Sequence, residues 1–308
     1  LYPLIQGYDS VAMKADVEDR LFTNVMELCT SAVRGCLVAP EGKKLVIADL
    51  SNIEGRMLAY LAGEQWKIDA FRDFDRGEGA DIYKLAYARS FDMKPEDVTK
   101  DQRQIGKVME LALGYQGGLG AFSTMAALYG VKLPEATIEG LISAWREAHP
   151  AVTTFWRECE RSARKAVKDP GEIFKVGSLV FRCDDGWLRI LLPSGRSLCY
   201  PKAEVSEDNK LSYEGVNQYT RKWERLETYG GKLVENTTQA MAREILTVGM
   251  WSAETAGYEV VLHVHDELIC ETPDSTEYSA EGLARLMALG PQWAVGLPLA
   301  AAGFETHR

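Results

Sequence analysis

The apolar and polar positions along the chain follow two periods, which predict a sheet interrupted by a long helical segment. Single runs with the length and pattern of a strand lie at residues 44–50 and 297–302. Residues 259–271 have the pattern of a strand pair, and residues 173–200 that of several short strands separated by turns. Between 53 and 167 the apolar positions recur at helical spacing, and a further long helix is predicted over 236–256. This order predicts an α+β protein in which one sheet domain is interrupted by a helical subdomain.

Local signals add detail to this outline. Gly35–Gly42 has the pattern of a strand that ends in a tight turn at Pro40–Gly42, so we expect it to form a hairpin with the strand that follows. Residues 17–29 have helical spacing, and a polar stretch runs from the strands near 200 to about Tyr219.

The first chemical signal lies at the end of an apolar run. Leu45–Ala48 ends abruptly in Asp49, after which Ser51 or Asn52 is a suitable helix cap. A buried strand that ends in an aspartate holds a charge rigidly at the edge of a sheet, as a metal-dependent reaction requires. A plain strand-to-helix turn, with the aspartate as a capping residue, explains this stretch equally well, so both interpretations stay open.

A second carboxylate lies between two apolar arms. Residues 260–270 surround His265, Asp266 and Glu267, and a hairpin would put these three at its turn. Charged residues at a hairpin turn are usually only solvated. Yet Asp266, like Asp49, belongs to strongly apolar strands, so the two aspartates could meet at one sheet edge. Paired carboxylates without zinc-type ligands suit magnesium, and two such ions serve in-line phosphoryl transfer.

The segment Asp101–Tyr115 predicts a helix with a cationic face. Arg103, Lys107, Leu111 and Tyr115 are spaced by four, so they lie along one side of it. Cations four residues apart repel, so a purely structural helix gains nothing from this arrangement. A polyphosphate ligand would relieve the repulsion, although a solvated basic stripe is also common.

Composition limits the class of protein without choosing a function. The 308 residues are 46% hydrophobic and 26% charged, which is typical of a soluble globular chain of two or three subdomains, and no apolar run is long enough to span a bilayer. The six scattered cysteines argue against a zinc site or a disulfide framework and favour the reducing cytoplasm. The net charge of −10 argues only weakly against nucleic-acid binding, because such binding depends on local patches. Since the chain begins with Leu1, we expect a fragment or a processed chain.

Together the stretches resemble the polymerase motifs of the DNA polymerase I family (family A), in the same order. Asp49–Arg56 is similar to the motif that commonly reads D-Y-S-Q-I-E-L-R, and Arg103–Tyr115 to the fingers helix R-x-x-x-K-x-x-x-F-x-x-x-Y. His265–Glu267 resembles the V-H-D-E motif. Asp81–Tyr83 is similar to the D-I-H segment, and Thr238–Glu244 to the primer–template helix M-Q-G-T-A-A-D. The resemblance covers most of the chain and is strongest to phage-encoded members.

The resemblance implies a role for each matching residue. Asp49 and Asp266 would be the catalytic residues that bind two Mg²⁺ ions, with the Leu50 carbonyl as a further ligand. The residues implied to contact the incoming deoxynucleoside triphosphate are Glu54, Tyr83, Arg103, Lys107, Leu111 and Tyr115. Those implied to contact DNA near the primer end are Gln239, Arg243 and His265, with Glu267 in a secondary role.

Some of these roles are more specific, and some positions depart from the family pattern. Glu54 would be the steric gate that crowds a 2′-hydroxyl, and Arg103 and Lys107 would hold the triphosphate. Leu111 stands where the family has Phe or Tyr against the nucleotide, which puts sugar discrimination in doubt. Tyr83 replaces a His, and its hydroxyl is still able to donate to a phosphate.

The implied fold is a polymerase right hand, with an antiparallel palm sheet interrupted by a helical fingers subdomain and with thumb and exonuclease absent from this chain. The expected boundaries are palm over 1–60 and 191–308 and fingers over 61–190. The implied partners are primer–template DNA and deoxynucleoside triphosphates. We expect a cytoplasmic monomer without a membrane partner.

The leading interpretation is a template-directed DNA polymerase of phage or prophage replication. A non-catalytic fragment that grips nucleic acid without its thumb is an alternative, against which the presence of both Asp49 and Asp266 argues. A single-subunit RNA polymerase shares this palm, but Glu54 argues against it. Basic clusters at 157–168 and 221–225 either contact phosphates or are solvated surfaces.

Overall fold

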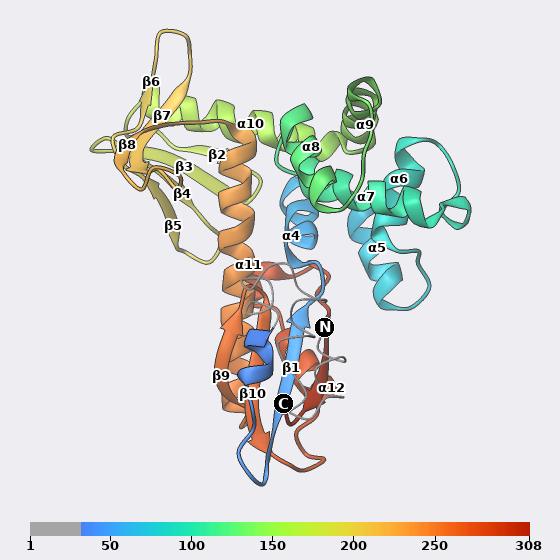
Figure 1. Cartoon of the computed structure of the whole chain (residues 1–308). Helices are drawn as coiled ribbons and strands as arrows, with labels where there is room; N and C mark the ends of the chain where they lie inside the picture. Colours follow the sequence, from blue (N-terminus) through green and yellow to red (C-terminus); the bar gives the residue numbers. More distant parts are fainter. Residues whose placement is uncertain (1–31) are drawn as a thin grey trace, which may run out of the picture. The chain divides into compact units, whose positions relative to one another are not determined.

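The computed structural model describes residues 32–308, and the chain divides into two compact units (Figure 1). Of the described residues, unit 1 combines 32–49 with Met250–Met287 and Ala301–Arg308. Unit 2 contains Leu50–Gly249 and Ala288–Ala300. The helix predicted over 17–29 lies outside the described residues.

Helices and antiparallel strands are mixed along the described residues, which confirms the predicted α+β class. The α-helices there are α4 (Ile53–Ala62), α5 (Gln65–Asp75), α6 (Ile82–Ser90), α7 (Lys100–Leu113), α8 (Leu119–Leu128), α9 (Glu135–Ala148), α10 (Pro150–Lys168), α11 (Gly230–Thr255) and α12 (Ala280–Met287). The strands are β1 (Lys43–Leu50), β2 (Phe174–Val176), β3 (Leu179–Asp184), β4 (Trp187–Leu191), β5 (Ser197–Tyr200), β6 (Glu204–Val205), β7 (Leu211–Val216), β8 (Trp223–Thr228), β9 (Glu259–Val264), β10 (Glu267–Pro273) and β11 (Ala301–Thr306). Short 3₁₀ helices are η1 (Val33–Cys36), η2 (Pro95–Asp97) and η3 (Gln292–Ala294).

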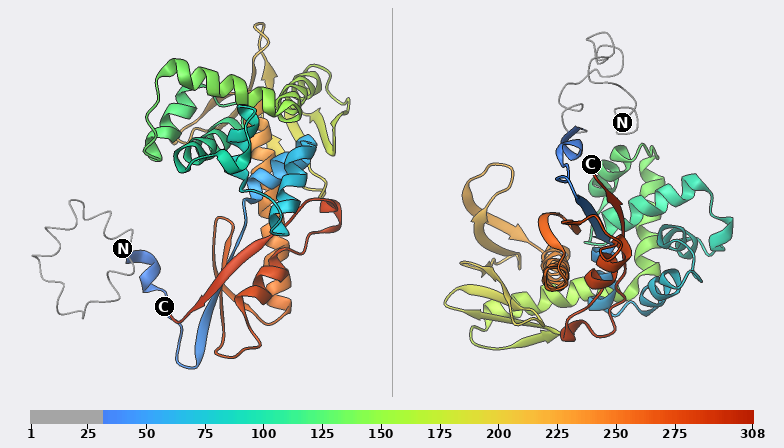
Figure 2. Two further views of the ribbon diagram at one scale, coloured as in Figure 1. Left: turned by 90° about the vertical axis from the view of Figure 1, so that its right-hand side faces the viewer. Right: turned by 90° about the horizontal axis from the view of Figure 1, so that it is seen from below.

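Unit 1 is built on a four-stranded sheet with the strand order β11-β1-β10-β9. β1 pairs antiparallel with β10, and β10 pairs antiparallel with β9. Figure 2 shows the blue strand β1 running beside the red strands of this sheet. Leu45 and Ile47 of β1 form a buried cluster with Ile269 of β10. Since full burial of such a side chain contributes about 1.5–3 kcal/mol, this cluster holds in place the strand that ends beside Asp49.

The predicted hairpin before β1 is wrong, although its turn is confirmed. Residues 37–40 form no strand, and η1 occupies much of the segment before them. Gly42 lies in the turn at φ 77°, a conformation that glycine adopts without strain. Both edges of β1 are taken by β10 and β11, so the preceding segment has no edge to pair with. Its apolar residues Leu37 and Ala39 pack against the buried cluster instead.

One further sequence prediction, the bounds of the final strand, needs correction. The final strand was expected over 297–302, but β11 begins at Ala301 because Leu297 closes a turn by donating its N–H to the Ala294 carbonyl at 3.0 Å. The polar stretch before Tyr219 contains β6 and β7. Leu211 and Tyr213 alternate with polar residues in β7, but only Leu211 is buried there, so the pattern is too short to mark a strand clearly.

Unit 2 is mainly helical, and a charged group sits inside its helical core. The Lys67 ammonium donates to the Glu110 carboxylate, and both side chains are almost fully buried. Trp145 Nε1 donates to Glu110 Oε1 at 2.9 Å, and His149 Nε2 lies 3.3 Å from the same oxygen. Burial by itself would raise the pKa of Glu110, but Lys67 and His149 outweigh it and hold the pKa well below the ordinary 4.5.

Two small antiparallel sheets follow α10 in unit 2. Their strand orders are β2-β3-β4-β5 and β6-β7-β8. The buried face of α10, which includes Phe155, Cys159 and Ala166, packs against this part of the unit, with contacts to β2, β3 and β6. The opposite face of α10 is left toward solvent.

Candidate functional site

The two predicted catalytic aspartates lie on neighbouring chain segments of the unit 1 sheet. Asp49 is exposed near the end of β1 and is paired in register with Glu267, the first residue of β10. Asp266 precedes Glu267 in the β9–β10 turn. His265 adopts φ 56° in that turn, and its Nδ1 lies 3.1 Å from Asp266 Oδ1. The predicted adjacency of the two aspartate-bearing strands is therefore confirmed.

The chemistry of the donors at this position fits a hard divalent cation. Asp49, Asp266 and Glu267 offer carboxylate oxygens, which are the ligands that Mg²⁺ prefers. Within residues 32–308, no group of three or more His, Cys, Asp or Glu side chains is arranged to hold a metal ion. Mg²⁺ is usually bound by one or two carboxylates together with water and substrate phosphates, so two aspartates on adjacent strands suffice for such a site. Leu50, the expected carbonyl ligand, ends β1.

In unit 2, α4 carries Glu54 in its first turn, and Arg56 anchors the start of this helix. The Arg56 side chain is 2% exposed and donates to both oxygens of Asp75 at 2.6 and 2.7 Å. Its Nε donates to the Ser51 carbonyl at 2.6 Å. Asn52, one of the two predicted caps, occupies the N-cap position at φ 48°, without a capping hydrogen bond from its side chain. The bidentate pair therefore fixes the segment that presents Glu54.

Tyr115 meets Glu54 across two helices of unit 2. The Tyr115 hydroxyl donates to Glu54 Oε2 at 3.1 Å. Burial, and then the nearby Glu54 carboxylate, raises the pKa of Tyr115, so the hydroxyl keeps its proton and remains a donor. Tyr115 lies just beyond the end of α7, and Gly231 at the start of α11 packs against it. A Cβ on Gly231 would lie 2.3 Å from the Tyr115 carbonyl oxygen. Only glycine fits that approach, which helps to fix the position of Tyr115.

Arg103 is held by a carboxylate that caps the preceding helix. Its Nε and Nη2 donate to the two oxygens of Asp81 at 3.0 and 2.8 Å. Asp81 Oδ1 also accepts the N–H groups of Tyr83 and Lys84 and so caps α6. The Arg103 guanidinium lies 5.3 Å from the centroid of the Tyr83 ring. Arg103 and Asp81 are 38% and 28% exposed, so solvent reaches this ion pair and another anion can compete for the guanidinium.

Lys107 lies one turn further along α7 and faces two aromatic rings. Its Nζ is 4.5 Å from the ring centroid of Tyr129 and 5.9 Å from that of Tyr83. The α6–α7 contact beside it is close, because a Cβ on Gly106 would lie 2.2 Å from the Tyr83 carbonyl oxygen. Leu111, on the next turn, is 40% exposed. The predicted cationic face is therefore real, and two tyrosine rings line it.

The residues expected to contact DNA lie on two different elements. Gln239 and Arg243 are both exposed and one turn apart on α11, so they share one face of that helix. His265 is exposed in the β9–β10 turn of unit 1. These positions suit surface contacts with a large ligand, and their roles stay predictions.

Sequence reasoning missed two partners of the predicted residues, Asp81 and Tyr129, and one anchor of α4, Arg56. Asp81 was noted only as part of a resemblance, although a helix-capping aspartate is a recognisable signal. Tyr129 and Arg56 had no assigned role. Tyr129 lies 22 positions beyond Lys107, and no local pattern links the two.

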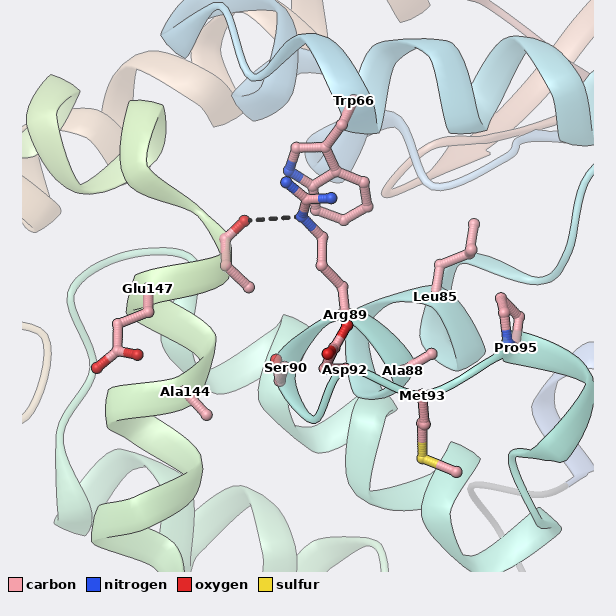
Figure 3. A pocket seen from close by; sticks show the side chains of 11 residues that line it. Trp66, Leu85, Ala88, Arg89, Ser90, Asp92, Met93, Pro95, Ala144 and Glu147 are labelled. Carbon is pink, nitrogen blue, oxygen red and sulfur yellow. Dashed lines mark hydrogen bonds between the residues drawn. The ribbon is translucent and has the colours of Figure 1, made fainter.

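One hollow of unit 2 lies apart from these residues. It has a volume of about 460 Å³ and is lined by parts of α5, α6 and α9, as Figure 3 shows. The Arg89 guanidinium lies 4.7 Å over the Trp66 ring and donates to the Ala148 carbonyl at 3.3 Å (Figure 3). None of the predicted site residues lines it.

Comparison with known proteins gives consistent matches. The family model described as DNA polymerase family A matches residues 24–169. The DNA polymerase of Bacillus phage SP02 is 39% identical over 293 residues, which cover 93% of this chain and 44% of the phage protein. DNA polymerase I of Pseudomonas aeruginosa is 29% identical over 83% of this chain and 24% of its own length. The chain therefore spans less than half the length of these relatives.

A solved structure shares the fold. The POL domain of Pol1 from M. smegmatis, in complex with DNA primer-template and dNTP, superposes with a TM-score of 0.62 at 22% identity. The match covers 89% of this chain and 41% of that one. Among the described residues, no helix has the length and apolar character needed to cross a membrane.

Proposed function

The chain belongs to DNA polymerase family A, and on that premise we propose that it is the palm and fingers portion of a template-directed DNA polymerase. The reaction would add deoxynucleotides to a primer 3′ end, in phage or prophage replication. The observation that carries the proposal is the register of β1 against β10, in which Asp49 lies opposite the residue that follows Asp266. Primer extension by the protein in its natural length tests it. A protein that binds primer–template but never extends it would favour the non-catalytic alternative.

Metal ions supply part of the chemistry in this proposal. Asp49 and Asp266, with the Leu50 carbonyl, would hold two Mg²⁺ ions. When bound, such ions activate the attacking oxygen and stabilise the leaving oxygen of an in-line displacement. The carboxylates neutralise and orient these ions, and the rigid strand β1 keeps Asp49 in place. Gln239, Arg243 and His265 would contact the DNA near the primer end, with Glu267 secondary.

Arg103 and Lys107 would bind the triphosphate. Tyr83 would support them from α6 and could donate its hydroxyl to a phosphate. The Arg103–Asp81 pair is half-exposed and screened by solvent, so a phosphate, which carries more charge, can displace Asp81 from the guanidinium. The aromatic rings around Lys107 hold its ammonium in one region without neutralising it.

We expect Arg103→Ala and Lys107→Ala each to lower kcat/KM for the nucleotide by roughly ten- to a hundredfold, because each removes a charge-assisted contact of about 1.5–3 kcal/mol. Steady-state single-nucleotide insertion measures the effect. Lys100→Ala is the matched control, since Lys100 is exposed at the start of the same helix. If the two variants lost only primer–template affinity, α7 would be a DNA-contact element instead.

The choice of sugar would depend on Glu54, whose carboxylate Tyr115 holds by a hydrogen bond. We expect Glu54→Ala to relax discrimination against ribonucleotides, because the side chain no longer fills the space of a 2′-hydroxyl. Tyr115→Phe leaves Glu54 in place and should relax this discrimination by at most roughly ten- to a hundredfold, since a hydrogen bond to a carboxylate contributes about 1.5–3 kcal/mol. Leu111→Phe should tighten nucleotide binding without changing the preference. The test measures insertion rates for matched deoxy- and ribonucleotides with each variant. An unchanged ratio of the two rates in Glu54→Ala would show that Glu54 is not the steric gate.

A further inference from the structure

The outer face of α10 carries a row of cations that the proposed active site does not use. Its inner face is buried, as the exposures of Val152, Phe155 and Cys159 show. The cations on the outer face are Arg157, Arg161, Arg164, Lys165 and Lys168. They recur at intervals of three or four residues, or stand next to each other, so they follow one side of the helix. The row extends over about 16 Å at a rise of 1.5 Å per residue.

This row forms one wall of a groove. A hollow of about 340 Å³ lies along it, and Asn209, in the turn between β6 and β7, closes one end. The Lys168 ammonium donates to Asn209 Oδ1 at 2.9 Å, which ties the helix to that turn. The Lys165 ammonium lies 5.9 Å from the centroid of the partly exposed Phe174 ring. The groove therefore has a charged wall with an aromatic ring beside it.

The anions near the groove do not balance its charge. Among residues 32–308, Glu160 is the one carboxylate that lines it, and its two oxygens accept from Arg164 and from the Gly230 N–H. Glu158 lies 3.6 Å from Arg161, but that ion pair is at the surface and contributes little. Five cations thus outnumber the two carboxylates that pair with the row, Glu158 and Glu160, in a chain whose net charge is −10.

The spacing of the row matches a nucleic-acid strand. Five cations over about 16 Å give one positive charge per about 4 Å. A strand of B-DNA carries one phosphate per about 3.4 Å of helix axis, and both strands together one per about 1.7 Å. The cations form a single row, so the groove can follow one strand and offers no second row for a complementary strand. The one aromatic ring near the row, Phe174 beside Lys165, adds a surface of the kind that proteins binding single strands combine with a basic groove.

We propose that this groove binds single-stranded nucleic acid through its phosphodiester backbone. The identity of the strand rests on the proposed polymerase function: it would be template DNA outside the active site. Recognition by charge implies no base preference and a strong dependence on salt.

The test compares two variants of the protein in its natural length. Arg161→Ala/Lys165→Ala removes two exposed cations of the groove, and Lys94→Ala/Lys132→Ala removes two exposed cations elsewhere in unit 2. The probes are a labelled oligodeoxythymidylate and a blunt DNA duplex, measured by fluorescence anisotropy over a range of salt. The groove variant should bind the oligodeoxythymidylate roughly tenfold more weakly, and its salt slope should fall by about 1.4, at about 0.7 per lost contact. The control variant should retain the wild-type affinity and slope.

Several outcomes would overturn the proposal. Equal affinity and slope for the two variants would show that the groove makes no nucleic-acid contact. An equal loss for the oligodeoxythymidylate and the duplex would reject the single-strand assignment. Matching thermal unfolding midpoints establish that the groove variant is folded. The binding assay needs neither metal nor nucleotide, so a wild-type protein that fails to extend primers would reject the polymerase proposal and leave this one standing.

Discussion

Asp49→Asn and Asp266→Asn are each expected to reduce nucleotide incorporation by roughly a thousandfold, which corresponds to about 4 kcal/mol of transition-state stabilisation. Asparagine keeps the shape of the side chain but removes the charge that would hold Mg²⁺. Rapid-quench measurement of a single incorporation, at saturating primer–template and nucleotide, isolates this step. Affinity for primer–template should change little, because two carboxylates do not attract phosphates.

Asp274→Asn is the matched control for these two variants. Asp274 lies in unit 1 close after β10, and its carboxylate is 3.0 Å from His307 Nε2 at the surface. The same substitution there should leave incorporation at the wild-type rate. Wild-type incorporation by Asp49→Asn would show that the metal ligands lie elsewhere, and the register of β1 against β10 would then have no catalytic meaning.

The carboxylate strands could be predicted because their signal is local. Leu45–Ala48 is an apolar run that is buried almost throughout, and the polar residue that ends it needs no partner to be recognised. The segment at 37–40 has the same kind of apolar character but forms no strand. Its fate depends on β10 and β11, which come from the far end of the chain and fill both edges of β1. The spacing of apolar residues within one segment does not show which distant segment it will pair with.

The same distinction separates the predictable and unpredictable parts of the site. The spacing of Arg103 and Lys107 places both on one face of α7 whatever surrounds the helix. The Arg103–Asp81 pair and the Tyr115–Glu54 hydrogen bond depend instead on how α4, α6 and α7 pack. That packing requires close approaches that only glycine permits, at Gly106 beside α6 for example. The sequence shows that a predicted helix contains a glycine, but it does not show which segment packs against that glycine.

The buried group of Glu110 and Lys67 has the largest expected effect on stability. Lys67 is 2% exposed at its side chain, and Glu110 supplies its negative partner. Removing one member of a buried pair leaves the other charge without compensation, which costs about 3–5 kcal/mol. Replacing both members by apolar residues of similar size is far less costly, because no charge is then left buried.

We therefore expect Glu110→Gln to lower the free energy of unfolding by about 3–5 kcal/mol, although the glutamine oxygen can still accept from Trp145. The double variant Lys67→Met/Glu110→Gln should recover much of that loss, because it leaves neither charge of the pair buried and keeps an acceptor for Trp145. In the wild type, the Glu110 pKa is lower in the folded than in the unfolded chain, so its contribution is complete above the ordinary 4.5 and is lost as the pH falls below it. Urea unfolding between neutral pH and strongly acidic pH measures both effects. The pH dependence below 4.5 should be shallower in Glu110→Gln, and an identical slope in the two proteins would contradict the depressed pKa.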